Sequence, residues 1–275
     1  MNRFPLPGMG RSVVAIQAPG QGVEQWAGAP SAALDDNGSF LLAYRLRTPD
    51  RAATIVARSD DGERFETVCE LERERWDAMS VERPALVRAD DGRWRLYVSL
   101  ATKNSKHWWI ALLEADTPEG FAEADWITVF PGDETVAVKD PIVQRRNGRW
   151  EARICCHPLA EPGEEDRMYT AFATSADGIA WEWQGTMLEP QPGRWDARGV
   201  RLTALPPSGG AAYDGRATKD ENWFERTGLL HNRNAPVSVA RYLDILPLPG
   251  GGYRIYYEWP VPGQAHELRT ELIAP

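Results

Sequence analysis

A hairpin opening that recurs along the chain is the feature that most constrains its fold. In one copy the run Glu82–Val87 precedes the turn Asp90–Trp94, and in another Lys139–Val143 precedes Arg146–Trp150. A third copy spans Ala29–Phe40. Each copy joins an apolar, proline-containing run through an Asp-Gly or Asn-Gly turn to an aromatic-led return strand. This pattern predicts β-hairpins.

The hairpin openings repeat at a long period. Five copies, the last two looser than the others, are anchored at Pro30, Pro84, Pro141, Thr203 and Asp244, with intervals of 54, 57, 62 and 41 residues. A period near 55 leaves room for about four short strands per unit, and five such units use the whole chain. Sheets that repeat in this way cannot bury their faces alone. The sequence therefore predicts an all-β fold, a five-bladed β-propeller of four-stranded antiparallel blades, in one domain over residues 1–275.

Other sequence features agree with this architecture. No window shows a sustained apolar repeat of helical period, whereas 24 glycines and 21 prolines are spread along the chain. We expect the run Ser12–Ile16 to pair beside Glu267–Ile273 and so close the last blade. The Ser-x-Asp-Gly turns at Ser59–Phe65 and Ser175–Trp181 are interpreted as structural, because Ser and Asp tie such turns and Gly takes a positive φ.

Composition excludes several function classes. A net charge of −9 with a pI near 5.1 argues against nucleic-acid binding. No apolar run approaches the roughly 20 residues that a membrane-spanning helix needs. The first twelve residues lack the apolar segment of a secretory signal. The three cysteines form no disulfide framework, and we expect a cytoplasmic protein without a membrane partner.

The propeller geometry gathers dispersed residues around one axial funnel. The innermost strand of each blade starts at the ligand-binding face and the second strand returns to it, so starts and ends meet there. A loop over residues 217–224, with Asn222 and Trp223, is expected to cover the funnel. Candidate funnel residues are Trp26, Glu82, Arg83, Asp140, Arg198, Tyr242 and Asp244 at strand starts, and His157, Asp214 and Arg216 at strand ends.

With its proline-led strand openings and Ser-x-Asp-Gly turns, the chain resembles the five-bladed glycoside hydrolases, which include family 43 arabinanases and xylosidases, fructofuranosidases and mannoside phosphorylases. The resemblance implies two carboxylates, one protonating the leaving oxygen and one activating water or attacking. It also implies a base aspartate before the proline of the first blade, a modulating aspartate before that of the second, and a glutamate that acts as the general acid near the third. Here those positions hold Ala29, Arg83 beside Glu82, and Asp140 behind Lys139. The chain departs from the family pattern at each of them.

The leading hypothesis is hydrolysis of a glycosidic bond. Glu82 and Asp140 would form the acid/base pair, and Asp214 would be a supporting carboxylate. Arg83, Arg216 and His157 would bind hydroxyl or acidic groups of the ligand. The arginines of the funnel favour an anionic ligand such as a uronic acid or a sugar phosphate. No phosphate loop, dinucleotide motif or histidine spacing typical of zinc is present, so no cofactor or metal is expected.

Two alternatives come from other function classes. The first is a non-catalytic carbohydrate-binding propeller that has lost the family's catalytic residues, which Ala29 favours. The second, a protein-interaction propeller, fits the many funnel charges less well. Carboxyl groups roughly 5–10 Å apart across an open pocket would favour the hydrolase. Carboxylates that are each paired with an arginine would favour the binding protein.

Overall fold

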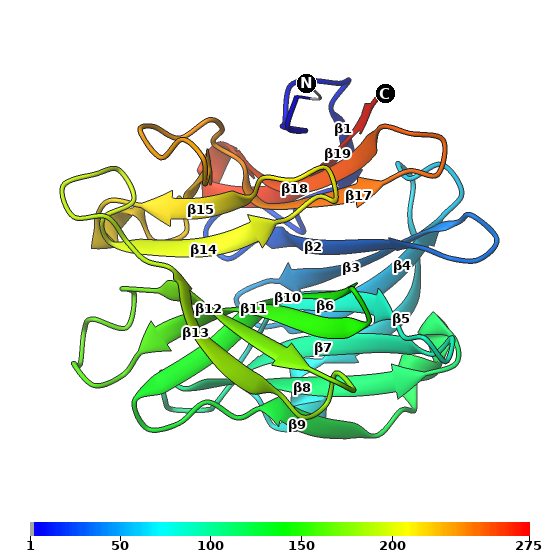
Figure 1. The fold of residues 1–275 in the computed structure, drawn as a ribbon. Coiled ribbons are helices and arrows are strands. Elements are labelled where there is room, and N and C mark those ends of the chain that lie inside the picture. Colours follow the sequence, from blue (N-terminus) through cyan, green and yellow to red (C-terminus); the bar gives the residue numbers. More distant parts are fainter. Residues whose placement is uncertain (1–2) are drawn as a thin grey trace.

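The computed structural model describes residues 3–275, and antiparallel strands dominate it (Figure 1). The first group contains β2 (Trp26–Leu34), β3 (Phe40–Arg47), β4 (Ala52–Ser59) and β5 (Glu66–Glu72), and the second β6 (Val81–Arg88), β7 (Trp94–Ala101), β8 (Trp108–Ala115) and β9 (Trp126–Phe130). The third contains β10 (Val136–Arg146), β11 (Arg149–Pro158), β12 (Tyr169–Ser175) and β13 (Glu182–Leu188). Then follow β14 (Gly199–Ala204), β15 (Ala212–Arg216) and β16 (Arg226–Leu229), and finally β17 (Arg241–Pro247), β18 (Tyr253–Val261) and β19 (Ala265–Ile273).

Strand pairing follows chain order within each group. β6–β9 and β10–β13 form separate four-stranded sheets, and β14–β16 form a three-stranded sheet. The groups β17–β19 and β2–β5 join into one sheet through a single parallel pair, His266 with Trp26. The all-β prediction is confirmed. The fourth group has three strands because the chain after β16 makes only isolated bridges, Thr227 with Ser238 and Leu229 with Asn232.

The N-terminal strand β1 (Val13–Ile16) pairs antiparallel with β19, as the sequence predicts. Glu271 on β19 binds the segment that precedes β1. Its carboxylate accepts hydrogen bonds from the backbone N–H groups of Gly8 and Gly10 at 2.9 and 2.8 Å. The first and last strands of the chain therefore share one sheet. The two ends lie close together in Figure 1.

Each group opens with a strand that contains a β-bulge. The register with the second strand shifts across residues 28–31, 82–85, 139–142, 202–204 and 241–244. Proline lacks the N–H that a ladder needs, and in the first three bulges it stands where the ladder is interrupted. Ala29, Asp140 and Tyr242 adopt left-handed φ values of 53°, 52° and 53° in these bulges. The recurring proline motif thus marks a recurring backbone irregularity.

The apolar core lies between neighbouring groups of strands. One cluster, with Trp76, Leu96 and Phe121, joins the first group to the second. Another, with Tyr97 and Trp150, joins the second group to the third. The helical segments of the described chain are short 3-10 turns: η1 (Arg73–Trp76), η2 (Pro118–Ala122), η3 (Lys219–Glu221) and η4 (Pro262–Gln264). None of the helices within residues 3–275 has the length and apolar character required to span a lipid bilayer.

Candidate functional site

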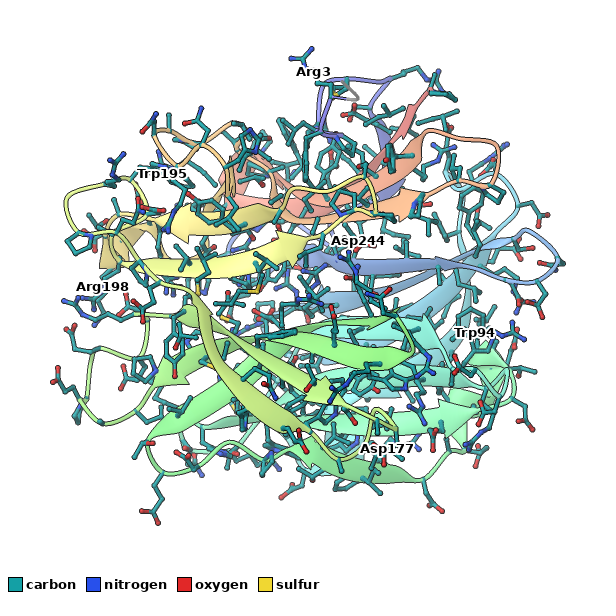
Figure 2. The ribbon with its side chains drawn as sticks, viewed as in Figure 1. Arg3, Trp94, Asp177, Trp195, Arg198 and Asp244 are labelled. Atoms are coloured by element: carbon teal, nitrogen blue, oxygen red, sulfur yellow. The ribbon has the colours of Figure 1, made fainter. Side chains whose placement is uncertain are left out.

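The innermost strands define two faces of the molecule. They start at a face that carries the segments 158–168, 189–198 and 217–225, here called the loop face, and end at a face of short turns. In Figure 1 the short turns after β2 and β17 point to the right. Figure 2 shows Arg198 on the opposite, left side and Asp244 in the interior between them.

Near the starts of these strands, a buried hydroxyl connects two of the predicted catalytic carboxylates. The Tyr242 Oη atom lies 3.3 Å from both Glu82 Oε2 and Asp140 Oδ2, and it accepts a hydrogen bond from Arg201 at 2.8 Å. The Arg201 guanidinium also stacks on the Tyr242 ring at 3.7 Å. The two carboxylate oxygens are thus no more than 6.6 Å apart, twice the 3.3 Å distance. Glu82, Asp140 and Tyr242 form one cluster across three groups of strands.

Glu82 is held in its ionised form by cations. Arg45 donates to Glu82 Oε2 at 2.7 Å, and Arg47 lies 3.6 Å from Oε1. Burial raises the pKa of Glu82, but Arg45, Lys139 and Arg47 outweigh burial and lower that pKa to about 2. A carboxylate with this pKa is not a proton donor near neutral pH. Glu82 keeps 5% of its surface exposed.

Asp140 and Asp214 share a single arginine. Arg201 donates through Nη1 to Asp140 at 3.0 Å and through Nη2 to Asp214 at 2.8 Å. Asp214 also accepts the backbone N–H of Tyr242 at 2.8 Å, and burial raises its pKa. The side chains of both aspartates are fully buried. Neither presents a free oxygen to the solvent.

A second group of ion pairs continues the network. Glu258 binds Arg45 at 2.5 Å and Arg241 at 2.6 Å, and Glu225 binds Arg241 at 2.7 Å and Arg216 at 2.8 Å. The Glu258 carboxylate occupies the space where a side chain at Gly28 would stand. Arg241 and Glu225 were not among the residues predicted from the sequence. Arg241 could have been found from its position directly before the bulge of β17, because Glu82 and Lys139 occupy the equivalent positions in β6 and β10.

Trp26 lies beneath the loop over residues 217–224 that the sequence analysis predicts. Its ring is 1% exposed and contacts Trp223 edge-on, with centroids 5.3 Å apart. The guanidinium groups of Arg45 and Arg47 each lie 5.2 Å from the Trp26 ring centroid. Trp223 is 37% exposed and takes a left-handed φ of 74°. Trp223 is therefore available to a ligand at this face, with Trp26 as its support, and the neighbouring Phe224 is also exposed.

Three further predicted residues lie at the loop face with internal partners. His157 Nδ1 lies 2.8 Å from the carbonyl oxygen of Glu165, and burial together with Lys139 lowers the pKa of His157. Arg198 binds Asp166 at 2.5 Å, and Arg216 donates to Asn222 at 2.5 Å as well as to Glu225. Apart from Nε of Arg216, which has no partner in the described chain, the guanidinium donors of Arg198 and Arg216 are directed to side chains and carbonyls of the protein. Within residues 3–275 no group of His, Cys, Asp and Glu side chains has an arrangement that would hold a metal ion.

Arg83 and Asp244 lie apart from the Glu82 cluster. Both line a cavity of about 710 Å³ at the other end of the innermost strands. Arg83 Nη2 lies 3.5 Å from Asp244 Oδ1. Sequence position placed these two residues at the same funnel mouth as Glu82, but Arg83 lies inside the bulge of β6 and Asp244 directly after the bulge of β17. A bulge adds a residue and reverses which face the following side chains occupy.

Comparison with known proteins reveals similarity in structure alone. No protein-family model matches the sequence, and no curated protein sequence matches it significantly. Among solved structures, the β-1,2-mannobiose phosphorylase from Listeria innocua in complex with β-1,2-mannobiose aligns over 98% of this chain and 93% of its own, at a TM-score of 0.59 and 13% identity. The α-L-arabinofuranosidase from Lactobacillus brevis aligns over 90% of both chains, at a TM-score of 0.67 and 13% identity.

A thermostable family-43 glycoside hydrolase matches at a TM-score of 0.66 and 12% identity, over 90% of this chain and 89% of its own. The chain has the fold of the propeller glycoside hydrolases. The resemblance stated from the sequence motifs is thereby confirmed at the level of the fold. An identity of 11–14% among the structures compared leaves function to be argued from the site.

Proposed function

We propose that this chain is a five-bladed β-propeller that binds a neutral carbohydrate at its loop face without hydrolysing it. The five groups of strands, each opening with a bulged strand, are the proposed blades. The similarity to a phosphorylase bound to β-1,2-mannobiose supports a sugar as the ligand.

One observation carries the non-catalytic assignment. Glu82, Asp140 and Asp214 are all buried and each accepts a hydrogen bond from an arginine. Glycosidases need one carboxyl group that releases a proton to the leaving oxygen and another that reaches water or the sugar. Removing an arginine from any of these carboxylates would leave a buried charge without a partner, at a cost of several kcal/mol. These contacts favour a structural role for the three carboxylates.

Charge balance favours a neutral ligand over the anionic one expected from the sequence. Arg45, Arg201, Arg216 and Arg241 are each paired with at least one buried carboxylate. Arginines that are already neutralised in this way add little attraction for a second anion. The exposed ring of Trp223 offers the apolar surface on which a neutral sugar ring stacks.

Hydrolysis is the second candidate, supported by the separation of Glu82 and Asp140. Their bridged oxygens are within 6.6 Å of each other. That limit is compatible with the spacing of about 5–5.5 Å in retaining glycosidases and with the lower end of the inverting range. A ligand would have to displace Arg45 and Arg201 before this pair could act.

Titration of β-1,2-mannobiose and of an arabinofuranosyl oligosaccharide, followed by tryptophan fluorescence and product analysis, tests the proposal. We expect binding without turnover and an affinity roughly fivefold weaker in Trp223→Ala, since one stacked ring contributes about 1 kcal/mol. Trp183→Ala is the matched control, because Trp183 is an exposed tryptophan on the outer strand β13.

Product formation decides between the two candidates. Turnover that disappears in Glu82→Gln or Asp140→Asn would establish the hydrolase. Absence of both binding and turnover across a wider panel of neutral sugars and aryl glycosides would contradict the carbohydrate assignment itself.

A further inference from the structure

The cavity at the short-turn face has walls from four of the five strand groups. Its volume is about 710 Å³, within the range of small-molecule sites. The second halves of β2, β6, β10 and β17 line it, largely with apolar residues such as Leu34, Leu86, Ile142 and Leu246. It lies at the opposite end of the strands from the proposed sugar site and shares none of that site's residues.

A buried arginine with unused donors borders this cavity. Arg83 is 1% exposed, and its Nε and Nη1 atoms have no hydrogen-bond partner within residues 3–275. Its charged contact is Asp244 at 3.5 Å, a long separation for an ion pair. Asp244 in turn directs its other oxygen to the backbone N–H of Ala32 at 2.8 Å. A buried guanidinium is costly unless its donors are satisfied, so an additional acceptor would stabilise Arg83.

Arg153 shows why the cavity matters as much as the unused donors. Its Nε and Nη1 atoms also lack partners in the described chain, and it is similarly buried at 6% exposure. Arg153, however, binds Glu151 at 2.6 Å and does not line this cavity. Arg83 combines unused donors, a weak carboxylate contact and an adjacent open volume.

The charges around the cavity have one predominant sign. Its charged lining residues are four arginines, Arg83, Arg88, Arg145 and Arg146, and one acid, Asp244. Gln144 adds a side-chain amide, which donates to the Leu205 carbonyl oxygen at 3.2 Å. Arg88 is paired with Asp35 and Asp36, and Arg145 with Asp90, which leaves Arg83 and Arg146 as the less compensated positive charges.

We propose that this cavity is a second ligand site, which binds a small organic anion through Arg83. The ligand carries a carboxylate or phosphate group at the Arg83 end and an apolar body against the aliphatic wall. The guanidinium fork suits either oxyanion. Arg146, whose guanidinium donates to the Leu205 carbonyl oxygen and has no carboxylate partner in the described chain, adds positive potential beside Arg83.

Calorimetric titration with phenyl phosphate, benzoate and inorganic phosphate tests this site. We expect phenyl phosphate or benzoate to bind more tightly than inorganic phosphate, because only the first two carry an apolar body. Arg83→Gln is expected to weaken binding at least tenfold. Asp244→Asn is expected to tighten it severalfold, because Arg83 loses its competing carboxylate.

Arg153→Gln is the matched control, since it removes an equally buried arginine that does not line this cavity. The fold of every variant is checked by circular dichroism. Tighter binding in Asp244→Asn is a result that mere destabilisation would not produce, and it keeps the test valid if Arg83→Gln unfolds. The proposal is overturned if the wild type binds none of the three anions at millimolar concentration. It is equally overturned if Asp244→Asn leaves the affinity unchanged, or if Arg153→Gln weakens binding as much as Arg83→Gln.

Discussion

Single arginines decide what the acidic residues of this protein can do. Arg201 donates to Asp140 and Asp214 at once, at 3.0 and 2.8 Å, and Arg45 joins Glu82 to Glu258. Because these groups are buried, each carboxylate depends on its arginine for the charge it carries. The side chains predicted as a catalytic set are therefore linked by ion pairs, which is the basis of the structural role that we propose for them.

Removing Arg201 should be strongly destabilising. Arg201→Met leaves two buried aspartates without their cation, so we expect the free energy of unfolding to fall by about 3–5 kcal/mol. Urea unfolding followed by fluorescence measures this change. Arg194→Met is the control, since Arg194 is exposed and donates only to Asn234. A loss below about 1 kcal/mol in Arg201→Met would show that the aspartates are stable without it.

The buried groups also predict how stability depends on pH. The folded-state pKa of Glu82 is lowered from 4.5 to about 2, so its stabilisation is present above about pH 4.5 and is lost as pH falls toward 2. Burial lowers the pKa of His266 from 6.5 to about 4. Between these pH values His266 binds a proton in the unfolded chain but not in the folded protein, so the free energy of unfolding falls as pH drops from 6.5 toward 4.

Two variants separate these contributions in unfolding experiments across pH. His266→Gln should flatten the pH dependence of stability between 6.5 and 4 and leave the more acidic part intact. Glu82→Gln should flatten the part below about 4.5, in addition to lowering stability at neutral pH. A pH profile that is the same in His266→Gln and the wild type would show that His266 already carries a proton in the folded protein.

At the level of elements, a repeated contact docks each Ser-x-Asp-Gly turn onto the preceding group of strands. Tyr97 on β7 donates its hydroxyl to the Gly178 carbonyl at 2.8 Å, and Tyr256 on β18 donates to the Gly62 carbonyl at 3.1 Å. Two residues earlier, Arg95 donates to the Asp177 carbonyl and Arg254 to that of Asp61. An Arg-x-Tyr motif on one strand thus pairs with a turn more than 80 residues away in the chain.

These hydroxyls should contribute measurably to stability. We expect Tyr97→Phe and Tyr256→Phe each to lower the free energy of unfolding by about 1 kcal/mol or more, because a buried carbonyl loses its donor. Chemical denaturation provides the measurement. Tyr253→Phe on the same strand as Tyr256 is the control, since Tyr253 is only half-buried. Equal effects from Tyr253→Phe and Tyr256→Phe would show that the contact with the turn adds nothing.

For the whole molecule, the pairing of β1 with β19 connects the two ends of the chain. Besides two backbone N–H groups, Glu271 accepts the hydroxyl of Tyr257 at 2.7 Å, and Tyr257 also bonds Ser12 at 2.8 Å. A single buried carboxylate thus holds the segment that precedes β1. The segment also packs Phe4, Leu6 and Met9 against the apolar cluster that contains Tyr257.

Glu271→Gln should loosen the N-terminal segment without unfolding the rest. A neutral amide keeps only part of the acceptor capacity, so we expect stability to fall by about 1–3 kcal/mol. Limited proteolysis should then cut near residues 8–12 faster than in the wild type, as read by mass spectrometry. Glu267→Gln, on the same strand with its side chain bound to Arg269, is the control. Cleavage that starts elsewhere in Glu271→Gln would contradict this role.

Much of the architecture could be predicted from the sequence because its signals are local. Turn residues and alternating runs predicted the hairpins, and Ser12–Ile16 was matched correctly with the last strand. The bulges at the proline positions were not predicted. The count of four strands failed in one group, where residues after β16 form bridges instead of a strand. Nothing local in that segment distinguishes a weak strand from a loop.

The candidate site was only partly predictable. Glu82, Asp140, Asp214, Tyr242 and Trp26 were selected by their positions at strand starts and ends, and the structure does bring them together. Arg241 and Glu225 were missed, and Arg83 and Asp244 line the cavity that opens at the short-turn face. A bulge changes which way the next side chain points, and that rotation cannot be deduced from spacing.

The sequence by itself determined the all-β class, the repeating units and part of the set of charged residues at the starts of the innermost strands, because periodicity and turn chemistry depend on neighbours along the chain. The tertiary structure alone decided which arginine pairs with which carboxylate, which residues face each end, and that Arg83 retains unused donors beside a cavity. Those outcomes depend on groups up to 213 positions apart, such as Arg45 and Glu258, whose mutual placement exists only after the sheets have packed.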